Sequence, residues 1–291
     1  MIEIAWLRDS GVRHTGIREI RLHRQGPCAV LLLHGLTGGP IELSYIAFHL
    51  HYRGGISVSC PALVNHGQPL VVLARTTWRE LWESAKSHFR EVREQARRDG
   101  VPLFVGGLSV GAILALMLAA EFPDEVSGVA CLSPTLFFDG WNVPWSRKLL
   151  HLVEFLPIKS LFFVREGHPY GLKDQMQREI MRKKYENARL DDTSAPPTTY
   201  AHFPVRLLCE ARHLIRRAKS MLPAVRAPVL VLQAVMDETS SPANAHYILD
   251  RVASRKTRLV LLENSYHIIT ADLEREKVAD SMLQFFLEIA G

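Results

Sequence analysis

A serine between two glycines, at the junction of two apolar segments, constrains the fold of this chain more than any other feature. The pentapeptide is Gly107-Leu-Ser-Val-Gly111. The residues before it, 101–106, form a short apolar run with β-branched and aromatic side chains, which predicts a buried strand. The residues after it, 112–120, are rich in Ala, Leu and Met and predict a buried helix. A strained turn of this kind projects a serine hydroxyl over the end of a sheet and above a helix N-terminus, so Ser109 is a candidate nucleophile.

Strand and helix patterns alternate along much of the chain on both sides of this turn. Besides the segments already named, strands are predicted at 16–24, 29–33, 56–60, 126–132, 228–233 and 257–262, and helices at 41–52, 77–98, 243–252 and 273–289. Such alternation predicts an α/β fold built on a mostly parallel, doubly wound sheet. Ligands of these sheets bind at the carboxyl ends of the strands, so polar residues that follow strands are the first candidates for a site.

The alternation breaks between residues 135 and 222. This stretch predicts helices at 147–156, 173–186 and 205–221 and a loop rich in Pro, Thr and Asp at 191–199. We interpret it as an inserted helical cap over the site, which divides the chain into a first core part (1–134), the cap (135–222) and a second core part (223–291). The cap is rich in Arg and Lys. These side chains indicate a solvated helix face, or alternatively a surface that recruits anionic ligands.

Composition excludes several classes of function. The 291 residues are 47% hydrophobic and 22% charged, as in an ordinary globular enzyme, and the net charge is only +5. No basic run with interleaved aromatic residues points to a nucleic-acid partner. No apolar run reaches the length needed for stable membrane insertion, and the first residues lack the pattern of a secretory signal. We therefore expect a cytoplasmic protein, whose oligomeric state the sequence leaves open.

No metal site or cofactor is expected. The cysteines Cys28, Cys60, Cys131 and Cys209 form no C-x-x-C pair and no zinc-binding spacing. Neither Gly-rich fingerprint of nucleotide-binding loops occurs in the chain. The cysteines are therefore interpreted as small hydrophobic residues in a reducing compartment.

Two further residues follow predicted buried strands and complete a candidate catalytic set with the serine. Asp237 comes after the strand at 228–233, and His267 comes after the strand at 257–262. A serine hydroxyl needs a neighbouring base to become an effective nucleophile, and histidine accepts and donates protons near neutral pH. Asp237 is expected to orient the His267 ring and stabilise its charged form. Glu263 is an alternative orienting acid, whereas Glu238 is expected to point elsewhere.

A Gly-rich loop follows the strand at 29–33. We interpret it as an oxyanion loop, in which the Leu36 N–H acts together with the N–H of Val110, the residue after the candidate nucleophile. His34 and Gly35 belong to the same loop and are predicted to line or brace the site. His66 is a further candidate for lining the site, and Trp141 is a candidate for the wall that contacts substrate.

These motifs together resemble those of the α/β-hydrolase superfamily, and within it the bacterial carboxylesterases and monoacylglycerol lipases, a pattern also labelled serine aminopeptidase S33. The resemblance rests on the segments 31–39, 65–67, 107–111, 231–238 and 265–270 and leaves out the cap and the first fifteen or so residues. It departs from the usual pattern at Asn65, where many relatives have Gly, at Val110, where Met, Leu or Gln is common, and in the longer cap.

The resemblance implies a serine hydrolase with the residue order Ser, acid, His. Its expected substrates are short or medium acyl esters or monoacylglycerols, cleaved through an acyl-enzyme. An alternative is a thioesterase or acyltransferase with the same triad, whose basic cap would dock an acyl carrier or coenzyme A thioester. A peptidase is less expected, because no acidic cluster for a substrate amino group is evident in the cap sequence. A non-catalytic binding protein is a further alternative.

Overall fold

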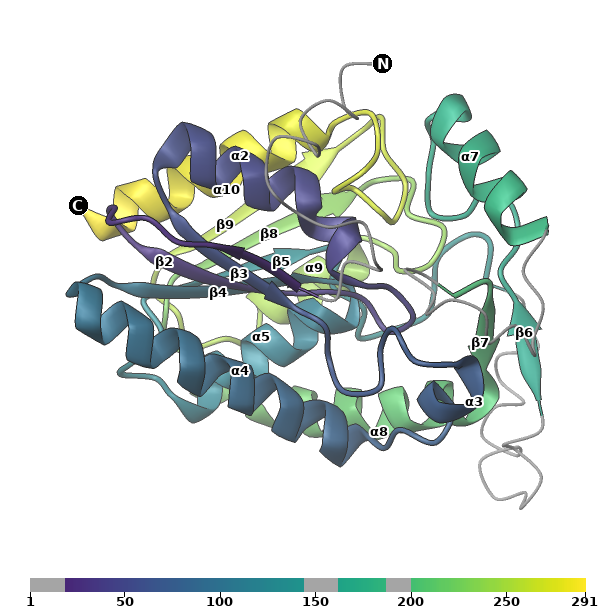
Figure 1. Cartoon of the computed structure of the whole chain (residues 1–291), viewed down its shortest axis with the longest axis horizontal. Helices are drawn as coiled ribbons and strands as arrows, with labels where there is room; N and C mark the ends of the chain where they lie inside the picture. The colour runs from purple at the N-terminus through teal and green to yellow at the C-terminus, as the bar shows by residue number, and fades with distance from the viewer. Residues whose placement is uncertain (1–18, 144–161, 187–199) are drawn as a thin grey trace.

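The computed structural model describes residues 19–143, 162–186 and 200–291, and in it the central element is a twisted sheet (Figure 1). The sheet has seven strands in the order β1-β3-β2-β4-β5-β8-β9, all parallel except the edge strand β1. The strands are β1 (Glu19–Leu22), β2 (Ala29–Leu33), β3 (Ser57–Pro61), β4 (Leu103–Leu108), β5 (Gly128–Leu132), β8 (Val229–Ala234) and β9 (Thr257–Leu262). The predicted α/β class with a mostly parallel sheet is therefore confirmed.

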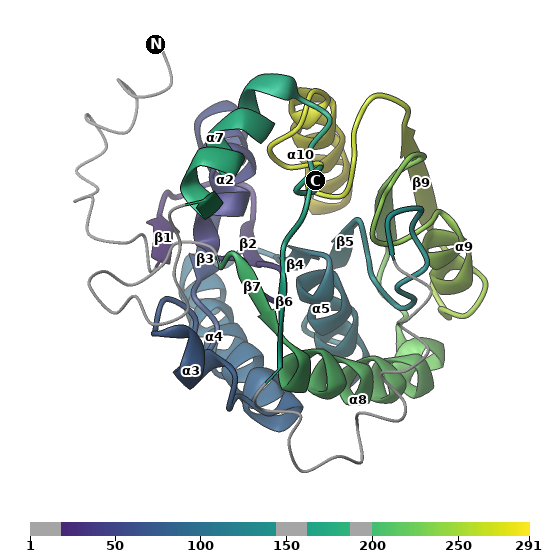
Figure 2. The same cartoon turned by 90° about the vertical axis from the view of Figure 1, so that its right-hand side faces the viewer.

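Helices cover both faces of this sheet (Figures 1 and 2). One face carries α2 (Ser44–Gly54) and α10 (Arg275–Ala290), and the other carries α4 (Trp78–Asp99), α5 (Val110–Glu121) and α8 (Val205–Met221). Two clusters of buried apolar side chains result, one on each side of the strands. Strand β2 contributes Leu31 and Leu33 to one cluster and Val30 and Leu32 to the other, as expected for a continuous apolar run buried on both faces.

Local sequence explains where the longer helices begin and end. Thr77 and Glu80 form a reciprocal capping box at the start of α4, and Gly100 ends that helix in the left-handed conformation. Helix α5 is apolar all round because it lies between the sheet and α8, so its residues are almost all buried. The short elements are η1 (Pro40–Leu43), α3 (Leu70–Leu73), η4 (Leu222–Ala224) and α9 (Ala243–Leu249).

The segment predicted as a cap contains a small antiparallel pair, β6 (Phe163–Arg165) and β7 (His202–Pro204), and helix α7 (Gln175–Glu186). Helix α8, which we also expected in the cap, packs instead against α4 and α5 (Figure 2). Its apolar stripe is buried in the core cluster on that face of the sheet. The helix predicted at 147–156 and the loop at 191–199 lie outside the described residues. The division of the chain into core and cap stays a prediction.

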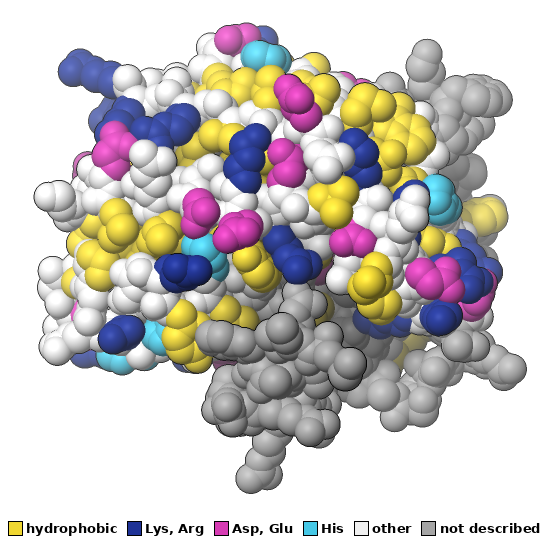
Figure 3. All heavy atoms as spheres, turned by 90° about the horizontal axis from the view of Figure 1, so that it is seen from above, with side chains coloured by type: hydrophobic (Ala, Val, Ile, Leu, Met, Phe, Trp, Pro, Cys, Tyr) yellow, Lys and Arg dark blue, Asp and Glu magenta, His cyan; other side chains and the backbone are white. Residues whose placement is uncertain are grey.

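The surface in Figure 3 carries Lys and Arg side chains interspersed with Asp and Glu over α2 and α10, without a continuous basic patch in that view. On this face, His49 Nε2 on α2 lies 2.8 Å from Asp280 Oδ1 on α10. None of the helices in the described ranges combines the length and the apolar composition that a membrane crossing requires.

Candidate active site

Ser109 occupies the tight turn between β4 and α5. Its backbone has φ 57° and ψ −117°, a strained conformation for a residue with a side chain. The Ser109 N–H donates to the Leu132 carbonyl of the next strand, at 2.9 Å. A Cβ added to Gly107 or Gly111 would overlap backbone atoms of the turn or of β2. The two glycines therefore permit the close approach of strand and helix that produces this turn.

Ser109, His267 and Asp237 form a continuous hydrogen-bonded chain across three strand ends. The Nδ1–H of His267 donates to Asp237 Oδ2 at 2.8 Å and Oδ1 at 3.0 Å, because the carboxylate can only accept. In the neutral ring, Nε2 is then an acceptor, and the hydroxyl of Ser109 donates to it at 3.0 Å. The sequence predicts that these three residues lie at one edge of the sheet, and the structure places their side chains in direct hydrogen-bonding contact.

Asp237 is buried and held from several directions. Its Oδ1 accepts from the backbone N–H groups of Thr239 and Ser240, each at 2.8 Å. Its Oδ2 accepts from the side-chain amide of Gln233 at 2.9 Å and from the Ser240 hydroxyl at 3.2 Å. These contacts fix the carboxylate that orients the imidazole ring, so little reorganisation is needed when the ring becomes charged.

Two more carboxyls lie close enough to influence His267. Glu238 is buried, and its Oε2 accepts from the His267 backbone N–H at 3.0 Å. Glu166 follows β6, and burial raises its pKa to about 8. Burial alone lowers the pKa of His267, but Asp237, Glu238 and Glu166 outweigh it and raise that pKa to about 9. The surroundings therefore favour the imidazolium that forms when His267 takes a proton.

The alternative orienting acid, Glu263, does not reach the imidazole ring. Its side chain is exposed, and its carbonyl accepts from Lys173 Nζ at 3.3 Å. Glu238, expected to point elsewhere, instead turns back to the His267 main chain. Within the described residues, Asp237 is the acid that contacts the ring.

Two buried histidines hydrogen-bond to backbone carbonyls of the predicted oxyanion loop (residues 35–39). His34 Nε2 accepts from the Leu63 N–H at 3.0 Å, so its Nδ1–H donates to Gly35 O at 2.8 Å. His66 Nε2 donates to Leu36 O at 2.8 Å, and its ring packs edge-on against His34. Burial lowers the pKa of both rings, which keeps them neutral. Both candidates thus contact the loop backbone from inside the protein.

The two N–H groups expected to bind an oxyanion belong to residues next to the nucleophile: Val110 follows Ser109 in the chain, and Leu36 follows Gly35, which packs against Ser109. Gly35 packs so closely that a Cβ added to it would come within 3.7 Å of Ser109 Cβ. Among the described residues, neither the Leu36 N–H nor the Val110 N–H donates a hydrogen bond to a protein acceptor. Both donors are therefore available to an oxygen bound beside Ser109.

Trp141 lies at the rim rather than in the interior. Its side chain is 53% exposed, its Nε1–H donates to Met236 O at 2.9 Å, and its ring meets that of Tyr266 edge-on. Its contact with substrate stays a prediction. Thr135 was not predicted, yet its Oγ1 lies 3.1 Å from Ser109 Oγ. Its position just after β5 is the signal that could have identified it.

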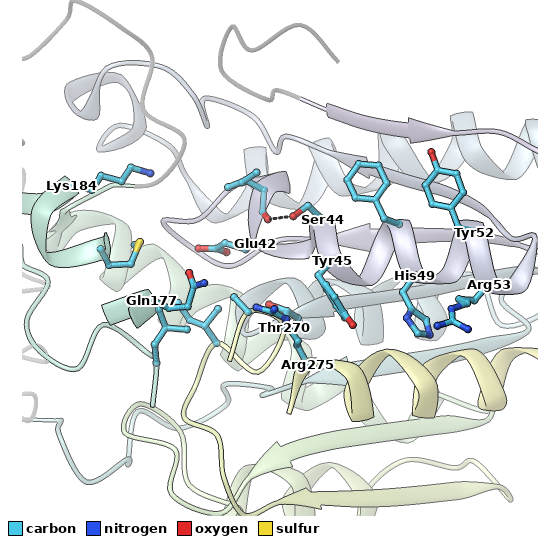
Figure 4. Close-up of a pocket in the computed structure, with 16 residues that line it drawn as sticks. Glu42, Ser44, Tyr45, His49, Tyr52, Arg53, Gln177, Lys184, Thr270 and Arg275 are labelled. Atoms are coloured by element: carbon cyan, nitrogen blue, oxygen red, sulfur yellow. Dashed lines mark hydrogen bonds between the residues drawn. The ribbon is translucent and has the colours of Figure 1, made fainter. Parts of the chain in front are cut away.

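A mainly apolar groove of about 590 Å³ lies beside this site (Figure 4). Its walls come from η1, α2, α7 and the segment that follows His267. Glu42 and Lys184 lie at the α7 end of the groove, and Tyr52 and Arg53 lie at the other end. The described part of the chain contains no group of three His, Cys, Asp or Glu side chains suited to a metal ion, and its four cysteines are buried and form no disulfide.

Comparison with known proteins identifies related sequences over most of the chain. The family described as "Serine aminopeptidase, S33" matches residues 28–274. The thermostable monoacylglycerol lipase of Bacillus sp. (strain H-257) is 24% identical over 91% of this chain and 93% of its own length. The carboxylesterase of Bacillus subtilis (strain 168) is 23% identical over 89% of this chain and 92% of its own length.

Solved structures show the same arrangement of strands and helices. A structure reported for the metagenome-derived lipolytic enzymes LipS and LipT superposes with a TM-score of 0.77 at 23% identity, covering 94% of this chain and 98% of that one. A soluble variant of monoglyceride lipase from Saccharomyces cerevisiae gives a TM-score of 0.75 at 14% identity, covering 92% of this chain and 90% of that one.

Proposed function

The chain belongs to the serine aminopeptidase S33 family and has the α/β-hydrolase fold predicted from its motifs, and on that premise we propose that it is a serine esterase. The observation that carries the proposal is the hydrogen-bonded chain from Ser109 through His267 to Asp237 at a strained strand-to-helix turn. The monoacylglycerol lipase and carboxylesterase names of the two Bacillus relatives support carboxylic esters as the substrate class.

In the proposed reaction, Ser109 Oγ attacks the ester carbonyl carbon while its proton moves to His267 Nε2. The carbonyl electron pair moves to the oxygen, which the Leu36 and Val110 N–H groups would stabilise. The tetrahedral intermediate then collapses, the alkoxide leaves with the proton from His267, and an acyl-enzyme remains. A water molecule, deprotonated by His267, attacks the acyl carbon and releases the carboxylic acid and free Ser109.

Hydrolysis of p-nitrophenyl esters of increasing acyl length tests the proposal. The wild-type protein is expected to turn over the shorter esters, and Ser109→Ala is expected to lower kcat by more than about a thousandfold. Ser220→Ala, which removes an exposed hydroxyl on α8, is the matched control and should keep wild-type activity. An esterase assignment fails if the wild type cleaves no ester at any chain length.

Adding two other substrate classes to this panel separates ester hydrolysis from the alternative activities. Coenzyme A thioesters of equal acyl length test the thioesterase alternative, and aminoacyl p-nitroanilides test peptidase activity. The peptidase arm matters because Glu42, Glu166 and Glu238 all interact electrostatically with His267, although only Glu166 belongs to the predicted cap. Faster turnover of an anilide than of any ester would replace the esterase with an aminopeptidase.

A further inference from the structure

Glu42 carries a carboxyl at this site that the proposed mechanism does not use. It belongs to η1, immediately after the oxyanion loop, and its N–H donates to Gly39 O at 3.0 Å. The side chain lines the end of the groove near α7 (Figure 4). Its backbone N–H thus closes the end of the loop, and its side chain turns back toward the loop glycines Gly35 and Gly38.

The Glu42 carboxyl packs against the glycines of the oxyanion loop. A Cβ added to Gly38 would overlap both carboxyl oxygens. A Cβ added to Gly35 would lie 3.6 Å from Glu42 Oε2 and 3.7 Å from Ser109 Cβ. The carboxyl and the serine therefore both lie close to the same side of Gly35.

Burial, neighbouring charges and backbone groups all act on the pKa of this carboxyl. Burial raises the pKa of Glu42 to about 7, while hydrogen bonds from the Gly35 and Gly39 backbone and the charges of His267 and Lys184 act in the opposite direction. The charge of Glu42 also raises the pKa of Glu166, which follows β6. In either protonation state a carboxyl oxygen remains to accept from the loop N–H groups.

We propose, on the premise of the esterase function, that Glu42 is a positioning residue that holds the oxyanion loop in its active shape. The loop has three glycines in five residues, so its own backbone preferences specify its conformation poorly. His66 donates to the Leu36 carbonyl, and the Glu42 carboxyl packs against Gly35 and Gly38. The Leu36 N–H is left to face the reacting carbonyl.

Two substitutions of similar volume separate this role from simple packing. Glu42→Met removes the acceptor oxygens, and Glu42→Gln keeps one of them. An acyl trifluoromethyl ketone probes the loop directly: Ser109 Oγ adds to its carbonyl carbon, the serine proton moves to His267, and the ketone oxygen becomes an oxyanion. Loss of an oxyanion donor lowers the rate roughly a hundredfold or more, so partial misplacement should cost about tenfold to a hundredfold.

We expect Glu42→Met to lower kcat/KM for a p-nitrophenyl ester and the affinity for the ketone by the same factor, with KM changed by less than about threefold. Glu42→Gln should restore both quantities to near the wild-type values. Glu276→Ala removes an exposed carboxylate from α10 and should change neither.

The proposal is overturned if Met and Gln at position 42 have the same effect, whether both retain activity or both lose it together with the thermal midpoint. A wild-type protein that neither hydrolyses the ester nor binds the ketone would instead contradict the esterase function itself. The two failures are therefore distinguishable in one set of measurements.

Discussion

At the scale of single residues, the proposed chemistry depends on the electrostatic surroundings of one imidazole. His267 is nearly buried and lies beside Asp237, Glu238 and Glu166, which together raise its pKa against the effect of burial. A general base acts in its neutral form, so the proposed reaction should accelerate as the pH rises through the pKa of His267. His267, Glu238 and Glu166 interact and titrate as a coupled group, so the profile reports these groups together.

Glu238→Gln should move the acidic limb of the kcat/KM profile to lower pH. The substitution keeps an oxygen that can accept from the His267 N–H but removes a negative charge that stabilises the imidazolium. The pKa of His267 therefore falls, and its base form is reached at a lower pH. Rates of p-nitrophenyl acetate hydrolysis between about pH 5 and 10 measure the shift.

Glu263→Gln is the matched control, because this exposed carboxylate lies four residues before His267 without contacting its ring. The acidic limb of the kcat/KM profile of Glu263→Gln should coincide with that of the wild type. An unchanged or more alkaline limb in Glu238→Gln would show that Glu238 does not act on the imidazole through its charge.

At the residue level, the sequence placed the candidate catalytic side chains at strand ends, and their catalytic roles stay a prediction. Ser109, Asp237 and His267 each follow a strand, and the structure brings them into contact. Thr135, Glu42 and Glu166 were missed for different reasons. Thr135 follows a strand but has no motif, Glu42 is brought back to the loop by the turn into η1, and Glu166 lies where no alternating pattern exists.

At the scale of elements, the junction of β4 and α5 is the most tightly constrained feature. A Cβ at Gly111 would overlap Leu33 O and come within 2.6 Å of His34 O, both in the segment that leads into the oxyanion loop. The glycine therefore couples the position of the nucleophile helix to that of the loop. Only the absence of a side chain allows both to reach the same edge.

Gly111→Ala should destabilise the fold and displace the turn. Relieving the overlap requires the helix to shift against β2, and overpacking of this kind costs about 3 kcal/mol. In a chain of this size that corresponds to a thermal midpoint lower by roughly 6–12 °C, measured by circular dichroism. Gly167→Ala is the control, since no heavy atom lies within 4 Å of its added Cβ. Equal midpoints for the two variants would contradict the packing argument.

Element prediction followed the strength of the local pattern. The central strands were predicted because each is a short apolar run buried on both faces, and α4 because its cap and periodicity agree. The helix predicted at 41–52 is divided into η1 and α2, since Pro40 starts a tight turn. The strands β6 and β7 have 3 residues each, too few to give a pattern.

At the scale of the whole molecule, a single buried carboxylate joins the segment before α7 to the loop that carries His267. Asp272 accepts from the N–H groups of Lys173 and Asp174 on one side and of Tyr266 and Leu273 on the other, at 2.7–2.9 Å. The inserted segment and the core loop therefore share one anchor. Loss of the Asp272 carboxylate should therefore perturb both the segment before α7 and the loop that carries His267.

Asp272→Asn should lower stability by about 3 kcal/mol and also reduce esterase activity. The new amide can accept through only one oxygen, so buried N–H groups are left without a partner. Asp174→Asn is the control, because asparagine caps a helix about as well as aspartate and the Met176 and Gln177 N–H groups keep their acceptor. Thermal unfolding and the rate with p-nitrophenyl esters measure the two effects, and an Asp272→Asn protein equal to the control would refute the anchor.

The central claim is that Ser109 is the nucleophile of an esterase, and covalent labelling with a fluorophosphonate tests it most directly. The account predicts one label per chain, located on Ser109 by peptide mass spectrometry, with esterase activity falling in proportion to the labelled fraction. His267→Ala should label far more slowly, because the base that removes the serine proton is gone. A label on another residue, or full ester hydrolysis by the fully labelled protein, would contradict the account.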